Sequence, residues 1–178
     1  MPSKVLQILA TSITHKNAKF RSLTAWVIGQ ITRSTIAPEI LMLLVKNLTD
    51  KDHNVRYNTI LAIQKLGEKA AIPEILEAFA TTLTDENETV RLHSTQTIKN
   101  LGEKAAIPKI LEALTTNLTD ENDNIRFYSI WAISMLGEKA ATPEILGKLV
   151  ANLSAQKRLF VDKIILTLDQ LKYCIFLY

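Results

Sequence analysis

The sequence predicts an all-α solenoid built from about five two-helix repeats, and two observations carry this prediction. The stretch LGEKAAIP at Leu66 returns at Leu101 and, as LGEKAATP, at Leu136, so each copy follows the last after 35 residues. Most of the prolines and glycines lie at these junctions, which leaves the segments between them free of residues that break helices. Recurrence at a fixed period of this length is the signature of stacked repeats.

The repeat extends over almost the whole chain. Two sets of aligned positions, a proline at the junction and an arginine in mid-unit, recur at the same spacing: Pro38, Pro73, Pro108 and Pro143, and Arg21, Arg56, Arg91 and Arg126. We therefore expect a single domain, 1–178, with repeats at approximately 3–33, 38–67, 73–102, 108–137 and 143–178. The outer repeats diverge most, as terminal units of a solenoid do. In the last one Val161 replaces the arginine and Ala155 replaces a turn aspartate.

The first helix of each repeat, helix A, is expected to begin at the junction proline, where a missing N–H costs nothing. In the helix A that follows the first LGEKAAIP junction, the apolar residues fall at helical spacing: Ile72, Ile75, Leu76, Phe79 and Leu83. The polar turn TDENE ends this helix.

The second helix, helix B, is expected to begin near Thr89 and to end at Gly102, because glycine adopts the left-handed conformation that closes a helix. Its inward face is predicted by comparing copies at offsets of 4, 7, 8 and 11 residues. These positions are Val55, Thr59, Ala62, Ile63 and Leu66, then Val90, Ser94, Thr97, Ile98 and Leu101, then Ile125, Ser129, Ala132, Ile133 and Leu136.

The turn LTDENETVR and the junction LGEKAAIP together resemble the HEAT-like repeats of the phycobilisome-lyase type. The residues that carry the resemblance are Asp85, Val90, Arg91, Leu101, Gly102, Ala106, Ile107 and Pro108. The resemblance implies paired helices and is unspecific for activity, because members of that family include scaffolds, bilin-attachment subunits and regulatory arrays.

Composition and motifs argue against an enzyme or a metalloprotein. His15, His53 and His93 have no ligand partner at suitable spacing, and no paired cysteines occur. We therefore expect no catalytic residues, no cofactor and no metal. The single cysteine, Cys174, and the absence of a signal sequence or a long apolar run favour a cytoplasmic protein without a membrane span.

Each internal repeat pairs an arginine with a turn aspartate, namely Asp50, Asp85 and Asp120 beside Arg56, Arg91 and Arg126. They could form an anion-binding ladder. We favour ion pairs within or between repeats, because identical placement in every unit is what packing requires.

The outer face of helix B varies between repeats and is rich in aromatic residues. We predict that it binds a partner protein through Trp26, Tyr57, Leu61, Leu92, Gln96, Phe127, Tyr128 and Trp131. The alternative is that these side chains pack on their own A helices or on the next repeat.

The function expected from the sequence is a non-enzymatic scaffold for protein–protein interaction. One alternative is nucleic-acid binding by the basic first repeat, through Lys4, Lys16, Lys19, Arg21 and Arg33, with Trp26 available for stacking. Another, implied only by the resemblance, is a bilin-lyase-type subunit. The apolar end of the chain, Cys174 to Tyr178, follows Leu171, the last recognisable helix position, and is predicted to form a cap or to mediate self-association.

Overall fold

The computed structural model describes residues 3–31, 37–153 and 158–175. These residues form α-helices and short 3₁₀ helices and contain no strand, which confirms the predicted α-solenoid. The helices are α1 (Ser3–Ile13), α2 (Ala18–Ile31), α3 (Pro38–Leu48), α4 (His53–Leu66), α5 (Pro73–Thr82), α6 (Glu88–Leu101), α7 (Pro108–Asn117), α8 (Asp123–Met135), α9 (Pro143–Leu153) and α10 (Arg158–Ile175). The 3₁₀ helices are η1 (Gly67–Ala70), η2 (Glu103–Ala105) and η3 (Gly137–Ala140).

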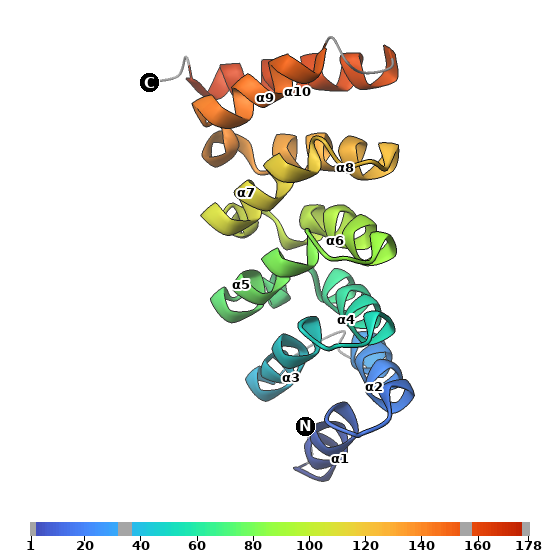
Figure 1. Cartoon of the computed structure of the whole chain (residues 1–178). Coiled ribbons are helices and arrows are strands. Elements are labelled where there is room, and N and C mark those ends of the chain that lie inside the picture. The colour runs from blue at the N-terminus through green and yellow to red at the C-terminus, as the bar shows by residue number, and fades with distance from the viewer. Residues whose placement is uncertain (1–2, 32–36, 154–157, 176–178) are drawn as a thin grey trace.

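The helices form two columns that rise from the N-terminus to the C-terminus (Figure 1). The odd-numbered helices are the A helices and the even-numbered helices are the B helices; from α1 to α8 the A helices lie on the left and the B helices on the right in that view. Each B helix contacts the next, from α2 through α10, and the A helices from α1 to α7 do the same. A residue at a given register position on one B helix therefore lies beside its counterpart on the next. The division of residues 1–178 into five numbered repeats stays a prediction.

Local sequence fixes where each helix begins and ends. The A helices α3, α5 and α7 each carry proline in their first turn. Each of the B helices α4, α6 and α8 is preceded by an N-cap residue, Asp or Asn, whose side chain accepts backbone N–H groups of the first turn. These N-caps are Asp52, Asn87 and Asn122. The junction glycines Gly67, Gly102 and Gly137 have φ values of 58°, 68° and 63°, which only glycine adopts without strain.

The inward faces predicted for the B helices are confirmed. All fifteen positions are at most 6% exposed, as are Ile75, Leu76 and Phe79 of α5 and Leu83, which follows it. Ile72, which precedes α5, is half-buried. Thr59, Ser94 and Ser129 lie in this core, and each hydroxyl donates to the carbonyl four residues earlier, at 2.7 to 2.8 Å. The core therefore contains small polar side chains without leaving these hydroxyls unsatisfied.

Ion pairs join each repeat to the next, as we predicted in preference to an anion-binding ladder. Arg21 binds Asp50, Arg56 binds Asp85 and Arg91 binds Asp120, with Nε–Oδ2 distances of 2.6, 2.6 and 2.8 Å. In each pair Nη2 contacts the second carboxylate oxygen, so the contact is bidentate. Both side chains of the middle pair are 8% exposed.

Each pair also holds the turn between helix A and helix B. Nη1 of Arg56 donates to the backbone carbonyl of Asp50 at 2.7 Å, in its own repeat, while its other nitrogens reach Asp85 in the following one. Oδ1 of Asp85 in turn accepts the backbone N–H of Asn87 at 2.9 Å. One guanidinium therefore connects two consecutive turns.

The series changes at the C-terminal end, where Ala155 occupies the next aspartate position in the sequence. Arg126 forms an ion pair with Asp123 of its own helix instead. Its Nη1 still donates to the carbonyl of Asp120, at 2.7 Å. The intra-repeat half of the contact thus persists where the acidic partner is missing.

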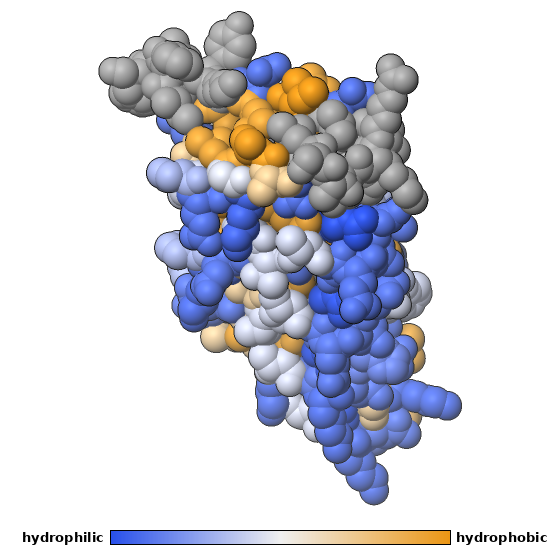
Figure 2. Space-filling model, turned by 45° about the horizontal axis from the view of Figure 1, so that its top comes forward, coloured by the Kyte–Doolittle hydropathy of each residue, from blue (hydrophilic) through white to orange (hydrophobic). Residues whose placement is uncertain are grey.

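The C-terminal end of the stack exposes apolar side chains (Figure 2). Val150 of α9 and Ile165 and Leu166 of α10 are 54%, 46% and 57% exposed. Our expectation that helical positions end at Leu171 is wrong, because α10 continues to Ile175. Phe176 to Tyr178 lie outside the described residues, so self-association through this end stays a prediction.

Substituting Arg56 by Met should lower the free energy of unfolding by about 3 kcal/mol, because it leaves the buried carboxylate of Asp85 without its cation. The matched variant Arg126→Met should cost less, because the Asp123 side chain that it pairs with is 45% exposed. Urea denaturation followed by circular dichroism measures both. Equal losses would show that the inter-repeat pair contributes nothing specific.

Glycine-to-alanine changes should have opposite signs at two helical positions. A Cβ on Gly29 would lie 2.8 Å from the Cα of Ala62, so Gly29→Ala should force α2 and α4 apart and destabilise the chain by about 1 kcal/mol or more. Gly147 of α9 has no atom within 4 Å of such a Cβ. Gly147→Ala should therefore stabilise by roughly 0.5 to 1 kcal/mol through helix propensity. Thermal melts of the two variants compare them directly, and stabilisation by both would disprove the close approach.

Acid should weaken the first inter-repeat pair. Burial alone would raise the pKa of Asp50, but hydrogen bonds from Arg21 and from the Asp52 backbone outweigh it, so the pKa lies below its ordinary value of 3.8. A lowered carboxyl pKa stabilises the fold above the unfolded-state pKa, and this contribution is lost as pH falls through the folded-state pKa. The unfolding free energy of the wild type should thus fall more steeply below about pH 4 than that of Asp50→Asn. Identical pH profiles would contradict the assignment.

Candidate functional site

The outward residues of four B helices form one continuous surface, which we call the B-helix face. It comprises three register positions on each helix: Ser22, Leu23 and Trp26 of α2, Tyr57, Asn58 and Leu61 of α4, Leu92, His93 and Gln96 of α6, and Phe127, Tyr128 and Trp131 of α8. Leu23 and Trp26 are exposed, and the other ten are half-buried. Every residue that the sequence predicted for partner binding lies on this face.

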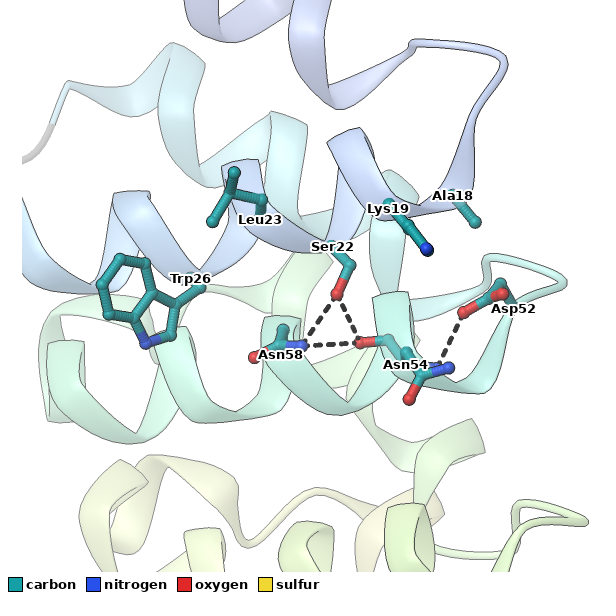
Figure 3. A pocket seen from close by; sticks show the side chains of 8 residues that line it. All are labelled: Ala18, Lys19, Ser22, Leu23, Trp26, Asp52, Asn54 and Asn58. Carbon is teal, nitrogen blue, oxygen red and sulfur yellow. Dashed lines mark hydrogen bonds between the residues drawn. The ribbon is translucent and has the colours of Figure 1, made fainter.

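At the N-terminal end of the face a groove of 470 Å³ lies between α2 and α4 (Figure 3). A small hydrogen-bond network forms its floor. Nδ2 of Asn58 donates to Oγ of Ser22 at 2.8 Å and to the carbonyl of Asn54 at 3.1 Å. Trp26 and Leu23, which are 46% and 57% exposed, lie along one side. The groove thus combines amide and hydroxyl groups with exposed apolar side chains.

In the middle of the face Tyr57 of α4 meets His93 of α6 edge to face, with ring centroids 4.8 Å apart. Burial lowers the pKa of His93 below its usual range, so the imidazole favours the neutral form. Tyr57 also packs against the hydrophobic core. Tyr57 therefore packs on the next repeat, as one part of the alternative interpretation expected.

At the C-terminal end Phe127, Tyr128 and Trp131 of α8 form an aromatic cluster. The ring centroids of Phe127 and Tyr128 are 5.5 Å apart, and those of Tyr128 and Trp131 are 6.0 Å apart. Two lysines from the neighbouring B helices contact the indole. Nζ of Lys99, from α6, lies 4.8 Å from its centroid, and Nζ of Lys163, from α10, lies 6.0 Å away.

Sequence comparison did not identify Leu23, Lys99 or Lys163 as part of this surface. Leu23 occupies the register position of Asn58, His93 and Tyr128, so alignment of the repeats could have found it. Lys99 follows Gln96 by three residues, which places both on one side of α6. Lys163 could not have been found in this way, because its contact with Trp131 depends on how α10 packs.

The described basic residues of the first repeat line three grooves. Lys19 lines the groove beside Trp26, Lys16 lines a second groove at the turn after α1, and Lys4 lines a third on α1. Arg21 also lines the second groove, together with Lys46 and Lys51 of the next repeat, and it is engaged there by Asp50. Arg33 lies outside the described residues.

Among the described residues no group of three or more His, Cys, Asp and Glu side chains is arranged to hold a metal ion. The histidines have other neighbours: His15 stacks on Phe20 with ring centroids 4.6 Å apart, and His93 contacts Tyr57. The side chain of Cys174 lies outside the described part of the chain. None of the described helices combines the length and apolar character needed to cross a membrane.

Comparison with known proteins bears on this arrangement. Residues 3–83 match a family described as HEAT repeats. No curated protein sequence matches the chain.

Solved structures of repeat proteins resemble the whole stack. A designed armadillo repeat protein in complex with the peptide (KR)4 superposes with a TM-score of 0.67 at 20% identity, covering 94% of this chain and 82% of that one. A computationally designed armadillo repeat protein for modular peptide recognition gives 0.69 at 19% identity, with the same coverage. An engineered protein gives 0.67 at 18% identity, covering 90% of this chain and 76% of that one.

At these identities the likeness concerns the fold. It agrees with the two columns of helices. The HEAT match covers the N-terminal part of these columns, and the same geometry continues beyond it. Residues 3–83 thus match HEAT repeats, and the described helices beyond them continue the same α-solenoid fold.

Proposed function

We propose that this protein is a non-enzymatic interaction scaffold that binds an extended segment of a partner protein along the B-helix face. The observation that carries the proposal is the recurrence of large side chains at matched positions of adjacent B helices. Both tryptophans, Trp26 and Trp131, occupy the same register position, three repeats apart. Tryptophan and tyrosine contribute more binding energy at interfaces than other residues do.

The frame beneath the face supports a fixed recognition surface. The inward residues of the B helices are buried, and bidentate ion pairs join consecutive turns. Side chains on the outer positions are thus held at a regular spacing while their identities differ between repeats. Such a combination allows sequence-specific contacts without a change of fold.

The geometry also bounds the length of the bound segment. Packed helices lie about 8 to 10 Å apart and an extended chain rises about 3.3 Å per residue, so a segment crossing the stack spends about three residues on each B helix. A partner segment of about ten residues would therefore reach from Trp26 to Trp131.

Two other functions were considered from the sequence. Nucleic-acid binding by the first repeat is not favoured, because Lys4, Lys16 and Lys19 line three different grooves and Arg21 is already paired with Asp50. A bilin-lyase role rests only on the resemblance and stays a prediction. A cytoplasmic location belongs to the present proposal, on the grounds of cysteine usage, because Cys174 is the single cysteine of the sequence.

Peptide display tests the proposal. A library of random peptides about twelve residues long is selected on the full chain, and the affinity of the enriched peptides is measured by fluorescence polarisation. Trp131→Ala and Trp26→Ala should each weaken binding by roughly tenfold or more, because each removes an aromatic anchor. Met42→Ala, which truncates a 49%-exposed side chain on the A helix α3, should leave it unchanged.

Circular dichroism melts of all three variants separate lost contacts from lost fold. Trp26 gives the clearest test, because its side chain is 46% exposed and its truncation therefore removes little core packing. Enriched peptides that bind both tryptophan variants as tightly as the wild type would contradict the proposal. So would a library that yields no enriched peptide.

A further inference from the structure

The B-helix face carries a consistent charge. Beyond their first residue, α2, α4, α6 and α8 contain no Asp or Glu. The arginines of these helices are used in the ion pairs of the turns. Three lysines remain, Lys19, Lys65 and Lys99, and none of them forms an ion pair with any described residue. The helices of the face therefore carry cationic side chains and no acidic residue beyond their first position, and Asp52 of a neighbouring turn lines the groove beside Lys19.

The strongest local feature of this face is the indole of Trp131 with its two lysines. Lys99 and Lys163 approach it from opposite neighbouring helices, at 4.8 and 6.0 Å from the ring centroid. No carboxylate of the described residues lies within ion-pair distance of Lys163. Desolvation by burial lowers its pKa, so its charged form lacks the solvation that an anion would restore.

An aromatic shelf adjoins these two ammonium groups. Tyr128 lies 6.0 Å from Trp131, and Phe127 lies 5.5 Å from Tyr128, centroid to centroid. A ligand that satisfies both parts of the site has a negative charge close to an apolar or aromatic side chain. Within a polypeptide this means Asp or Glu next to a residue such as Phe or Leu.

A polyphosphate fits the surroundings less well. The turn that leads into α8 contains Asp120, Glu121 and Asp123, and the turn before α6 contains Glu86 and Glu88. These acidic turns border the face along its edge, where a nucleic-acid backbone would meet repulsion. A single carboxylate bound by the two lysines avoids these acidic turns.

We propose that Trp131, Lys99 and Lys163 form an anchor site on the B-helix face that takes an acidic residue and a neighbouring aromatic or aliphatic residue of a partner protein. This inference rests on the proposed function and adds the chemistry of the partner. The carboxylate binds the ammonium groups beside the indole, and the apolar side chain packs on Tyr128 and the indole edge.

Two synthetic peptides with blocked ends test the site. The first alternates glutamate and phenylalanine, and the second has glutamine in place of each glutamate. Binding is measured by fluorescence polarisation, and also by the emission of Trp131 in a Trp26→Phe variant, where it is the sole tryptophan. We expect the glutamate peptide to bind about tenfold more tightly, to change Trp131 emission, and to lose affinity as salt is added.

The charge preference should depend on the two lysines alone. In the double variant Lys99→Gln, Lys163→Gln it should shrink to about twofold or less. The control Lys46→Gln, which removes an exposed lysine from α3, should keep the full preference. Equal affinity for both peptides, a preference that survives the double variant, or unchanged Trp131 emission would each overturn the inference. Displacement by a single-stranded oligonucleotide at lower concentration than by the glutamate peptide would also overturn it.

The outcomes separate this inference from the function on which it rests. Display-selected peptides that need Trp131 but show no preference for acidic residues would leave the scaffold function standing and remove the acidic anchor. If no peptide of either kind depended on the B-helix face, both proposals would fall together.

Discussion

The bidentate contact between an arginine of one repeat and an aspartate of the next is the interaction on which the rest of the structure depends. It acts at two levels, because the guanidinium also donates to the carbonyl of its own turn and the aspartate accepts an N–H of the following turn. Helix packing alone leaves two columns of helices free to slide past each other. A geometrically demanding ion pair in each turn fixes their register. The spacing of everything on the outer face follows from this register.

A fixed frame allows the exposed face to vary. Along the B helices the inward positions are apolar or small in every repeat, while the outward positions include tryptophan, glutamine, leucine and tyrosine. The two tryptophans show how this works at a single register position. Trp26 is 46% exposed beside a groove with a hydrogen-bonded floor, whereas Trp131 is half-buried between two lysines. One scaffold position thus supports two different chemical environments.

The positions of the charged side chains also follow the repeat. In the central repeats the turns that precede the B helices carry acidic residues near the helix N-termini, and Lys65 and Lys99 lie in the last turns of α4 and α6. This arrangement complements the helix dipoles and contributes modestly to stability. It also leaves the middle of the B-helix face without acidic side chains. A feature with an ordinary structural cause therefore defines which partner chemistry the face can accept.

The amino-acid sequence alone predicted the solenoid, the boundaries of the central helices and the buried stripes, because a 35-residue period repeats the same local signals of proline, cap and glycine in each central unit. It missed the end of α10, which continues to Ile175. It also predicted partner-binding residues at outward register positions of the B helices, since register follows from helical periodicity, but it missed Leu23, Lys99 and Lys163. It left open whether Arg56 binds the aspartate of its own turn or of the next, because that choice depends on the distance between packed repeats. The tertiary structure also decided that Tyr57 contacts His93 and that Lys99 and Lys163 meet at Trp131. These residues lie far apart in the sequence, and only the stacking of α6, α8 and α10 brings them together.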